Sequence, residues 1–309
     1  MNERSSPQGP ALPTVLALTV AVLAVSSSAP LIAFAAAPAL AIAFWRNAIA
    51  SVVLTPITFG PRRTEIRGIT RRDALFCVLA GVALAAHFGT WMPSVQLGSV
   101  ATATALVATQ PVWQGLIAMI QGRRPSRAGW LGIALAVIGA AWATGVDVSV
   151  SGQAVFADVL ALLGGIAAAL YTALGERSRA RLSTTTYTWI CYGTCAILLL
   201  VVCLSAGIQL TGFDGRTWAA ILAIVAGAQL LGHSMFNYAL QHTSATTVSV
   251  LILLEVPGAA LIAWLWLGQT PEPAALPGLA ILLSGVVVVV LGAARERQAQ
   301  LALTPGLAD

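Results

Sequence analysis

Long apolar runs separated by short polar connections extend over nearly the whole chain. Each run is close to the roughly 20 residues that a helix needs to cross the hydrocarbon core of a bilayer. Short segments of alternating apolar and polar residues, typical of barrel strands, are absent from the sequence. The pattern predicts an all-α integral membrane protein with ten transmembrane helices, at Ala11–Ala35, Leu40–Phe59, Ala74–Gln96, Val100–Gln121, Trp130–Val146, Val155–Leu174, Thr185–Ile208, Thr217–Leu240, Leu251–Gly268 and Leu276–Leu291.

The composition supports this prediction. Of the 309 residues, 58% are hydrophobic and only 9% are charged, whereas a soluble domain has about 25% charged residues. Lipid is therefore the solvent for most of the protein. The first run, Ala11–Ala35, is too long for the apolar region of a usual signal peptide, and we interpret it as the first helix.

The charged residues predict the orientation of the chain. All basic residues are arginine, and with ten crossings every loop arginine except Arg216 falls on one side. Asp147, Asp158, Asp214 and Glu272 fall on the other side. By the positive-inside rule, we expect cytoplasmic N- and C-termini and a multi-pass protein of the cell (inner or plasma) membrane. The net charge of +5 thus reflects topology, and we expect no nucleic-acid partner.

The two halves of the chain resemble each other. The shift that places His87 on His233 also places Pro111 on Pro257 without a gap. Such fixed self-similarity indicates an internal repeat. The same shift produces five further matches, Gly122 on Gly268, Pro125 on Pro271, Gly132 on Gly278, Ala134 on Ala280 and Gly139 on Gly285.

The repeat predicts how the chain is organised. Five helices per half is an odd number, so the second copy must cross the membrane in the opposite sense, as an inverted repeat. Inverted repeats place the substrate site near the midplane, between the halves, and work by alternating access. We expect a cytoplasmic N-terminal tail (1–10), a first repeat (11–147), a second repeat (155–292) and a cytoplasmic C-terminal tail (293–309).

Several segments resemble a known family. The second half contains ALQHTSATTVSVLILLEVPGAALIAWLWLGQTPEPAALPGLAILLSGVVVVVLG, and the first half contains FWRNAIAS, SVQLGSVATATALVATQPVWQGLIAMIQG and GWLGIALAVIGA. These segments resemble the repeats of the EamA-type drug/metabolite transporter superfamily in its ten-helix form. The resemblance implies an inner-membrane carrier, often an exporter of amino acids, metabolites or drugs. Val256 and Gln269 depart from the usual repeat, which often has proline and glutamate there.

Glu255 lies near the middle of an apolar run, two residues before Pro257. An acidic group at bilayer depth costs about 2.5–3.5 kcal/mol on insertion scales, so it indicates a functional site. Glu255 can bind a proton or a cationic group, or it can be a protonated structural carboxyl bonded to a neighbouring helix. Proline within a run frees a backbone carbonyl, so Pro30, Pro111 and Pro257 are candidate helix breaks or hinges.

His87 and His233 occupy equivalent depths in the two halves, and we expect them on opposite sides of the midplane if the repeat is inverted. Histidine titrates near neutrality and can relay protons or contact a substrate, or it can simply pack between helices. Arg46 can line the cavity and hold an anionic group or Glu255, or its side chain can extend to the interface. Three amides are candidate cavity residues or interhelical hydrogen-bonding groups: Gln110, Gln114 and Asn237.

These features favour a secondary transporter of small metabolites, amino acids or drug-like solutes. The phosphate-binding motif GxxxxGK[ST] is absent, so a gradient, with protons as a candidate, or exchange would drive transport. The alternative is a membrane-embedded enzyme or a scaffold, but HExxH and GxSxG are absent. The four cysteines show no CxxC spacing, and we expect no metal or cofactor. The partners expected are the bilayer and a small molecule, with the protein a monomer or homodimer.

Overall fold

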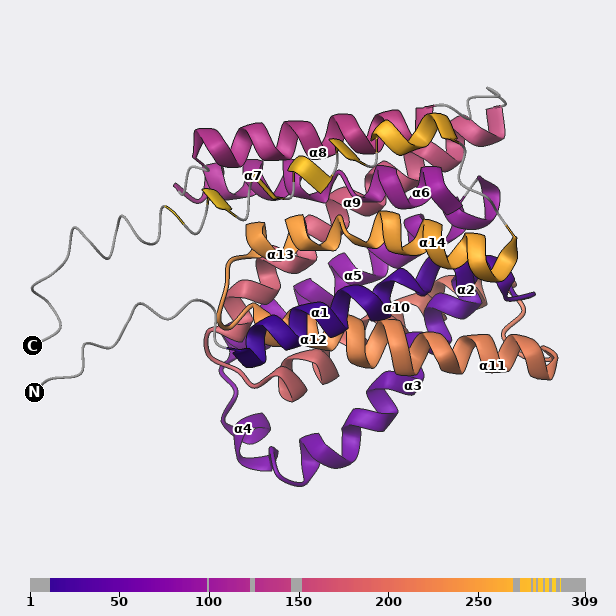
Figure 1. Ribbon diagram of the computed structural model, residues 1–309. Helices are drawn as coiled ribbons and strands as arrows, with labels where there is room; N and C mark the ends of the chain where they lie inside the picture. The colour runs from indigo at the N-terminus through magenta and orange to yellow at the C-terminus, as the bar shows by residue number, and fades with distance from the viewer. Residues whose placement is uncertain are drawn as a thin grey trace, which may run out of the picture.

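The computed structural model describes residues 12–98, 100–122, 126–145, 152–268 and, with gaps, 273–295 (Figure 1). The regular structure in these ranges is helical. The elements are α1 (Leu12–Ser26), α2 (Ser28–Phe34), α3 (Ala39–Phe59), α4 (Arg63–Gly68), α5 (Arg71–Leu97), α6 (Val100–Val107), α7 (Gln110–Ile120), α8 (Arg127–Gly145), α9 (Gly152–Arg179), α10 (Thr184–Ser205), α11 (Gly215–Ile224), the π-helix η1 (Val225–His233), α12 (Ser234–Ala239), α13 (Ala245–Ile252), α14 (Glu255–Leu267) and the short 3₁₀ helix η2 (Pro273–Ala275).

Seven helical segments in the described part of the chain are long and apolar enough to cross a membrane. Each coincides with one of the predicted helices, so the prediction of a helical multi-pass membrane protein is confirmed. The segments are Leu12–Phe34, Ala39–Phe59, Arg71–Leu97, Val155–Arg179, Thr184–Ser205, Gly215–Ala239 and Ala245–Leu267.

The other three predicted helices are not among these seven segments. The range Val100–Gln121 forms two helices, α6 and α7. The range Trp130–Val146 corresponds to α8. The range Leu276–Leu291 lies only partly within the described residues, and so does the predicted C-terminal tail, while the predicted tail 1–10 lies outside them.

Three of the ten apolar runs predicted from the sequence are interrupted close to a proline. The first breaks at Ser27 between α1 and α2, before Pro30. The second breaks between α6 and α7, where Pro111 occupies the first turn of α7. The third breaks between α13 and α14, before Pro257. A proline cannot donate to the residue four positions earlier and its ring collides with that carbonyl, so the helix restarts just ahead of it.

The core consists mainly of α3, α5, α9 and α10, and α5 packs along α9 more extensively than any other pair of elements. Small residues permit the close approach of α9 to α5, since a Cβ added at Gly164 of α9 would lie 2.9 Å from the Trp91 Cβ of α5. The interrupted helix α13–α14 lies between α6–α7 and α1 (Figure 1). The breaks in these helices therefore meet beside the four-helix core.

Candidate transport cavity

A cavity of about 50 Å³ lies where the interrupted helices meet. It has room for a few water molecules but is much smaller than the roughly 300–1,000 Å³ of a typical ligand pocket. A metabolite would therefore need the surrounding helices to move apart. The polar and aromatic lining residues are Ser28, His87, Trp91, Thr104, Gln110, Tyr171, Thr172, His233, Phe236, Asn237 and Glu255.

Five of the seven predicted polar site residues line this cavity: Glu255, His87, His233, Gln110 and Asn237. His87 and Gln110 belong to the first half of the chain, and the other three belong to the second half, so the fold brings the two halves together at the cavity. Arg46 and Gln114 are buried but are not among the lining residues. The prolines Pro30, Pro111 and Pro257 also lie outside the lining, each within a few residues of a residue that belongs to it.

Glu255 is the first residue of α14 and is 9% exposed, toward the cavity. It is the acidic side chain among the described cavity residues, and within the described part of the chain it has no hydrogen-bond partner. The start of a helix carries a partial positive charge from its unsatisfied N–H groups. The helix break thus places the carboxylate at an end that favours negative charge, with its oxygens available to a ligand.

The two histidines approach each other across the cavity. Their ring centroids are 6.4 Å apart, and the His87 ring stacks on Trp91 with an interplanar angle of 5°. His87 Nδ1 lies 3.0 Å from the Gly164 carbonyl oxygen, so Nδ1 bears the proton in the neutral ring and Nε2 is free to accept. His233 closes the π-helix η1 and lies 6.0 Å from the Tyr171 ring.

Two amide side chains both line the cavity and join helices. Asn237 Nδ2 donates to the Tyr171 hydroxyl at 2.5 Å. Gln110 Nε2 donates to the Thr172 hydroxyl at 2.9 Å and so links α7 to α9 across the two repeats. Sequence reasoning missed Tyr171 and Thr172. Their adjacent polar side chains within an apolar run were the available signal.

Arg46 is 0% exposed, so its side chain does not extend to the interface. Its Nε donates to Gln229 Oε1 at 2.7 Å, its Nη1 lies 3.4 Å from the Ser28 hydroxyl, and its guanidinium lies 4.1 Å from the centre of the Phe88 ring. Gln229 Nε2 in turn donates to Asn47 Oδ1 at 3.0 Å.

Arg46 Nη2 has no hydrogen-bond partner within the described residues, and Arg46 forms no ion pair with Glu255 there. The amide of Gln114 is likewise buried without a partner in the described part of the chain, and we have no physical account of it. No three His, Cys, Asp or Glu side chains among the described residues group closely enough to hold a metal ion.

A helical multi-pass bundle, with interrupted helices around a cavity that contains a few polar side chains, is typical of one class of protein, the membrane transporters. The comparison with protein families is more specific. The chain belongs to the EamA-like transporter family, whose model matches residues 12–145 and 155–291. The protein is therefore a small-molecule transporter of the membrane and not an enzyme.

Two relatives have curated names. An uncharacterized transporter of Archaeoglobus fulgidus is 24% identical over 248 residues, which cover 79% of this chain and 85% of the relative. A probable terminal-alkyne amino-acid exporter of Streptantibioticus cattleyicolor is 28% identical over 278 residues, 84% of this chain and 86% of the relative. A solved crystal structure shares the fold, with a TM-score of 0.72 and 17% identity over 90% of this chain and 97% of that chain.

Proposed function

We propose that the protein exports small amine-bearing metabolites, with amino acids as the leading class, by alternating access through the cavity. The observation on which this proposal depends is the Glu255 carboxylate, which faces the cavity and has no hydrogen-bond partner among the described residues, although the charge of Arg46 acts on it. A carboxylate in such a place attracts an ammonium group or a proton. The relative named as an amino-acid exporter supports the same substrate class.

Glu255 also provides a mechanism for coupling. The carboxylate can bind either the ammonium of a substrate or a proton, so that entry of one favours release of the other. Export of substrate toward one side would then exchange for protons from that side. His87 Nε2, left free by the bond of Nδ1 to Gly164, and His233 are positioned to accept a polar group of the same ligand.

The architecture that we propose has ten helices in two inverted repeats, 11–147 and 155–292. The equivalent breaks ahead of Pro111 and Pro257 support the repeat. The arginine-rich loops support cytoplasmic termini, with tails 1–10 and 293–309 on that side of the cell (inner) membrane. Pro30, Pro111 and Pro257 serve as hinges where half-helices tilt. A single chain contains the whole cavity, so a monomer suffices and a homodimer is compatible with it.

The test is a flux measurement with purified protein in proteoliposomes. A panel of radiolabelled amino acids is loaded inside, and efflux is followed with and without an imposed pH gradient. We expect saturable efflux of at least one amino acid, accelerated when the outside is acidic. If no amino acid or amine in the panel moves faster than from empty liposomes, the proposed substrate class is wrong. If the efflux rate is the same with and without the pH gradient, the proposed proton coupling is wrong.

A further inference from the structure

Arg179 is an unusual member of the loop arginines. In the sequence it belongs to the basic connection after Val155–Leu174, yet its residue is only 1% exposed. Its Nε donates to the Asn237 carbonyl oxygen at 2.8 Å and its Nη2 donates to Gln241 Oε1 at 2.9 Å. Its Nη1 donates to the Leu182 carbonyl oxygen. All three guanidinium nitrogens are therefore bonded, whereas the side chain of nearby Arg181 is 62% exposed.

The bonds of Arg179 join the end of α9 to the end of α12. Asn237 belongs to α12, and both Asn237 and Leu240 line the cavity. Gln241 begins the connection to α13, another helix that lines it. A cation is favoured at a helix C-terminus, where carbonyl groups lack partners. Arg179 thus fixes the position of the two helices that enclose the cavity at this end.

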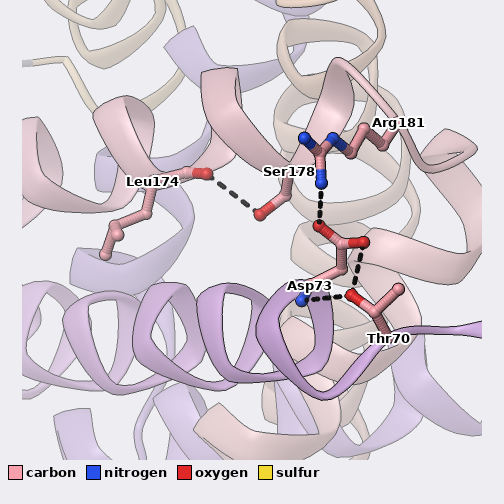
Figure 2. A network of polar contacts seen from close by, with 5 residues as sticks. All are labelled: Thr70, Asp73, Leu174, Ser178 and Arg181. Carbon is pink, nitrogen blue, oxygen red and sulfur yellow. Dashed lines mark hydrogen bonds and ion pairs between the residues drawn. The ribbon is translucent and has the colours of Figure 1, made fainter.

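The chain just after Arg179 is itself anchored to the first repeat. Arg181 Nη1 lies 3.5 Å from Asp73 Oδ1, and the Thr70 hydroxyl donates to Asp73 Oδ2 at 2.7 Å (Figure 2). Glu65 Oε1 accepts from the Ser183 N–H at 2.5 Å, and its Oε2 accepts from the Ser183 hydroxyl at 2.6 Å. These contacts fix the position of the loop, so the bonds of Arg179 hold α12 against an anchored part of the first repeat.

We propose that Arg179 is a latch that closes the cavity on its own side of the membrane, and so is a positioning residue for transport. The inference rests on the proposed alternating access, because only then must this end open. Opening requires α12 to leave α9, which breaks the bonds to Asn237 and Gln241. The positive-inside pattern makes this the cytoplasmic side, where an exporter admits its substrate.

The latch can be tested by sided labelling. Val248→Cys introduces a thiol at a cavity position of α13, and a membrane-impermeant maleimide is added to inverted or right-side-out vesicles. The four native cysteines are buried, and the chain without the new cysteine sets their background. Arg179→Gln should raise the labelling rate from the Arg179 face by at least about tenfold, because it removes both bonds to the end of α12 and the loss of one buried bond to a charged group already has an effect of that size.

Matched variants keep the test decisive. Arg177→Gln changes an exposed arginine near the same end of α9, outside the loop anchor, and should change labelling by less than about twofold. Arg179→Lys keeps the charge but not the fork of donors, so it should give an intermediate rate, and it replaces Arg179→Gln if that variant does not reach the membrane. Equal labelling of the Arg179 variants and the parent chain would overturn the latch. If the protein with Arg179 unchanged exports no amino acid, the proposed function is wrong. The labelling rates do not depend on that assay, so the two failures can be distinguished.

Discussion

The two broken helices of the repeat have the same backbone break but different chemistry. The shift that places Pro111 on Pro257 places Thr109 on Glu255. In the first repeat, the Thr109 hydroxyl donates to the Leu106 carbonyl at 2.7 Å, and Thr109 is not among the cavity residues. In the second repeat, the carboxylate of Glu255 faces the cavity. The two repeats therefore share the position of the helix break, whereas of the two equivalent positions only the one in the second repeat has an acidic side chain.

A second pair of helices differs in the same way. His87 lies on the regular helix α5, while its counterpart His233 ends the π-helix η1. Gln229 of η1 accepts from Arg46, and the residue equivalent to it in α5 is Ala83. π-helical turns insert an extra residue per turn and often occur at functional sites. The second repeat thus supplies Gln229, which accepts from the buried guanidinium of Arg46, and the first repeat has no equivalent amide.

The largest expected effect comes from exchanging the two equivalent residues, Thr109→Glu with Glu255→Thr. A carboxylate at position 109 would not face the cavity, so we expect efflux to fall by about 100-fold or more. Thr109→Val alone should keep efflux within about threefold, since it removes only local bonds. Proteoliposome efflux measures both. Full activity of the exchanged variant would mean that the two breaks are functionally equivalent.

Removing Gln229 should destabilise the second repeat. Gln229→Leu leaves Arg46 Nε buried without an acceptor, which costs about 3 kcal/mol and lowers the apparent Tm by roughly 6 °C or more. Ala83→Ser at the equivalent position of α5 is the control and should change Tm by less than about 2 °C. Thermal unfolding of the purified protein in detergent gives the comparison. An unchanged Tm for Gln229→Leu would show that Arg46 does not depend on it.

Pro111→Ala and Pro257→Ala test whether the two hinges are equivalent. Each change restores a backbone N–H and removes a ring that costs about 3 kcal/mol in a helix interior, so it favours a continuous helix. We expect both variants to fold and to export about three- to tenfold more slowly, by similar factors. A loss confined to one of the two variants would contradict the shared hinge geometry.

The smallest effect concerns the loop anchor Glu65, which lies outside the spans. Partial burial alone would raise the pKa of Glu65, but hydrogen bonds from Ser183 and Thr186 outweigh it and lower that pKa below its ordinary value of 4.5. The stabilisation is therefore present above pH 4.5 and is lost as pH falls below it. Glu65→Gln should cost about 1 kcal/mol at neutral pH and flatten this acid dependence of Tm. The exposed Arg67→Gln on the same helix should leave the acid dependence in place.

A proline acts on its own helix, so the sequence marked Pro30, Pro111 and Pro257 as candidate breaks. Proline alone does not specify a break, because Pro56 and Pro93 lie inside the unbroken helices α3 and α5. The repeat identified His87 and His233 as equivalent positions, but it did not predict their contact. An inverted repeat is expected to put them on opposite sides of the midplane, whereas their ring centroids are 6.4 Å apart. The partners of Arg46 could not be predicted, since Gln229 is 183 residues away and lies in a π-helix without a clear sequence signal. Arg179 resembled the exposed arginines around it, and only the approach of α12 to α9 distinguishes it.

The most direct test of the central claim is efflux by Glu255→Gln beside the parent protein, in proteoliposomes prepared together and assayed from acidic to alkaline pH. Glutamine keeps the shape of the side chain but can neither carry the charge nor release a proton. We predict that the variant keeps the parental Tm within about 3 °C and exports no faster than empty liposomes leak at every pH. Parental efflux by the variant across the whole pH range would show that the carboxylate in the cavity takes no part in transport.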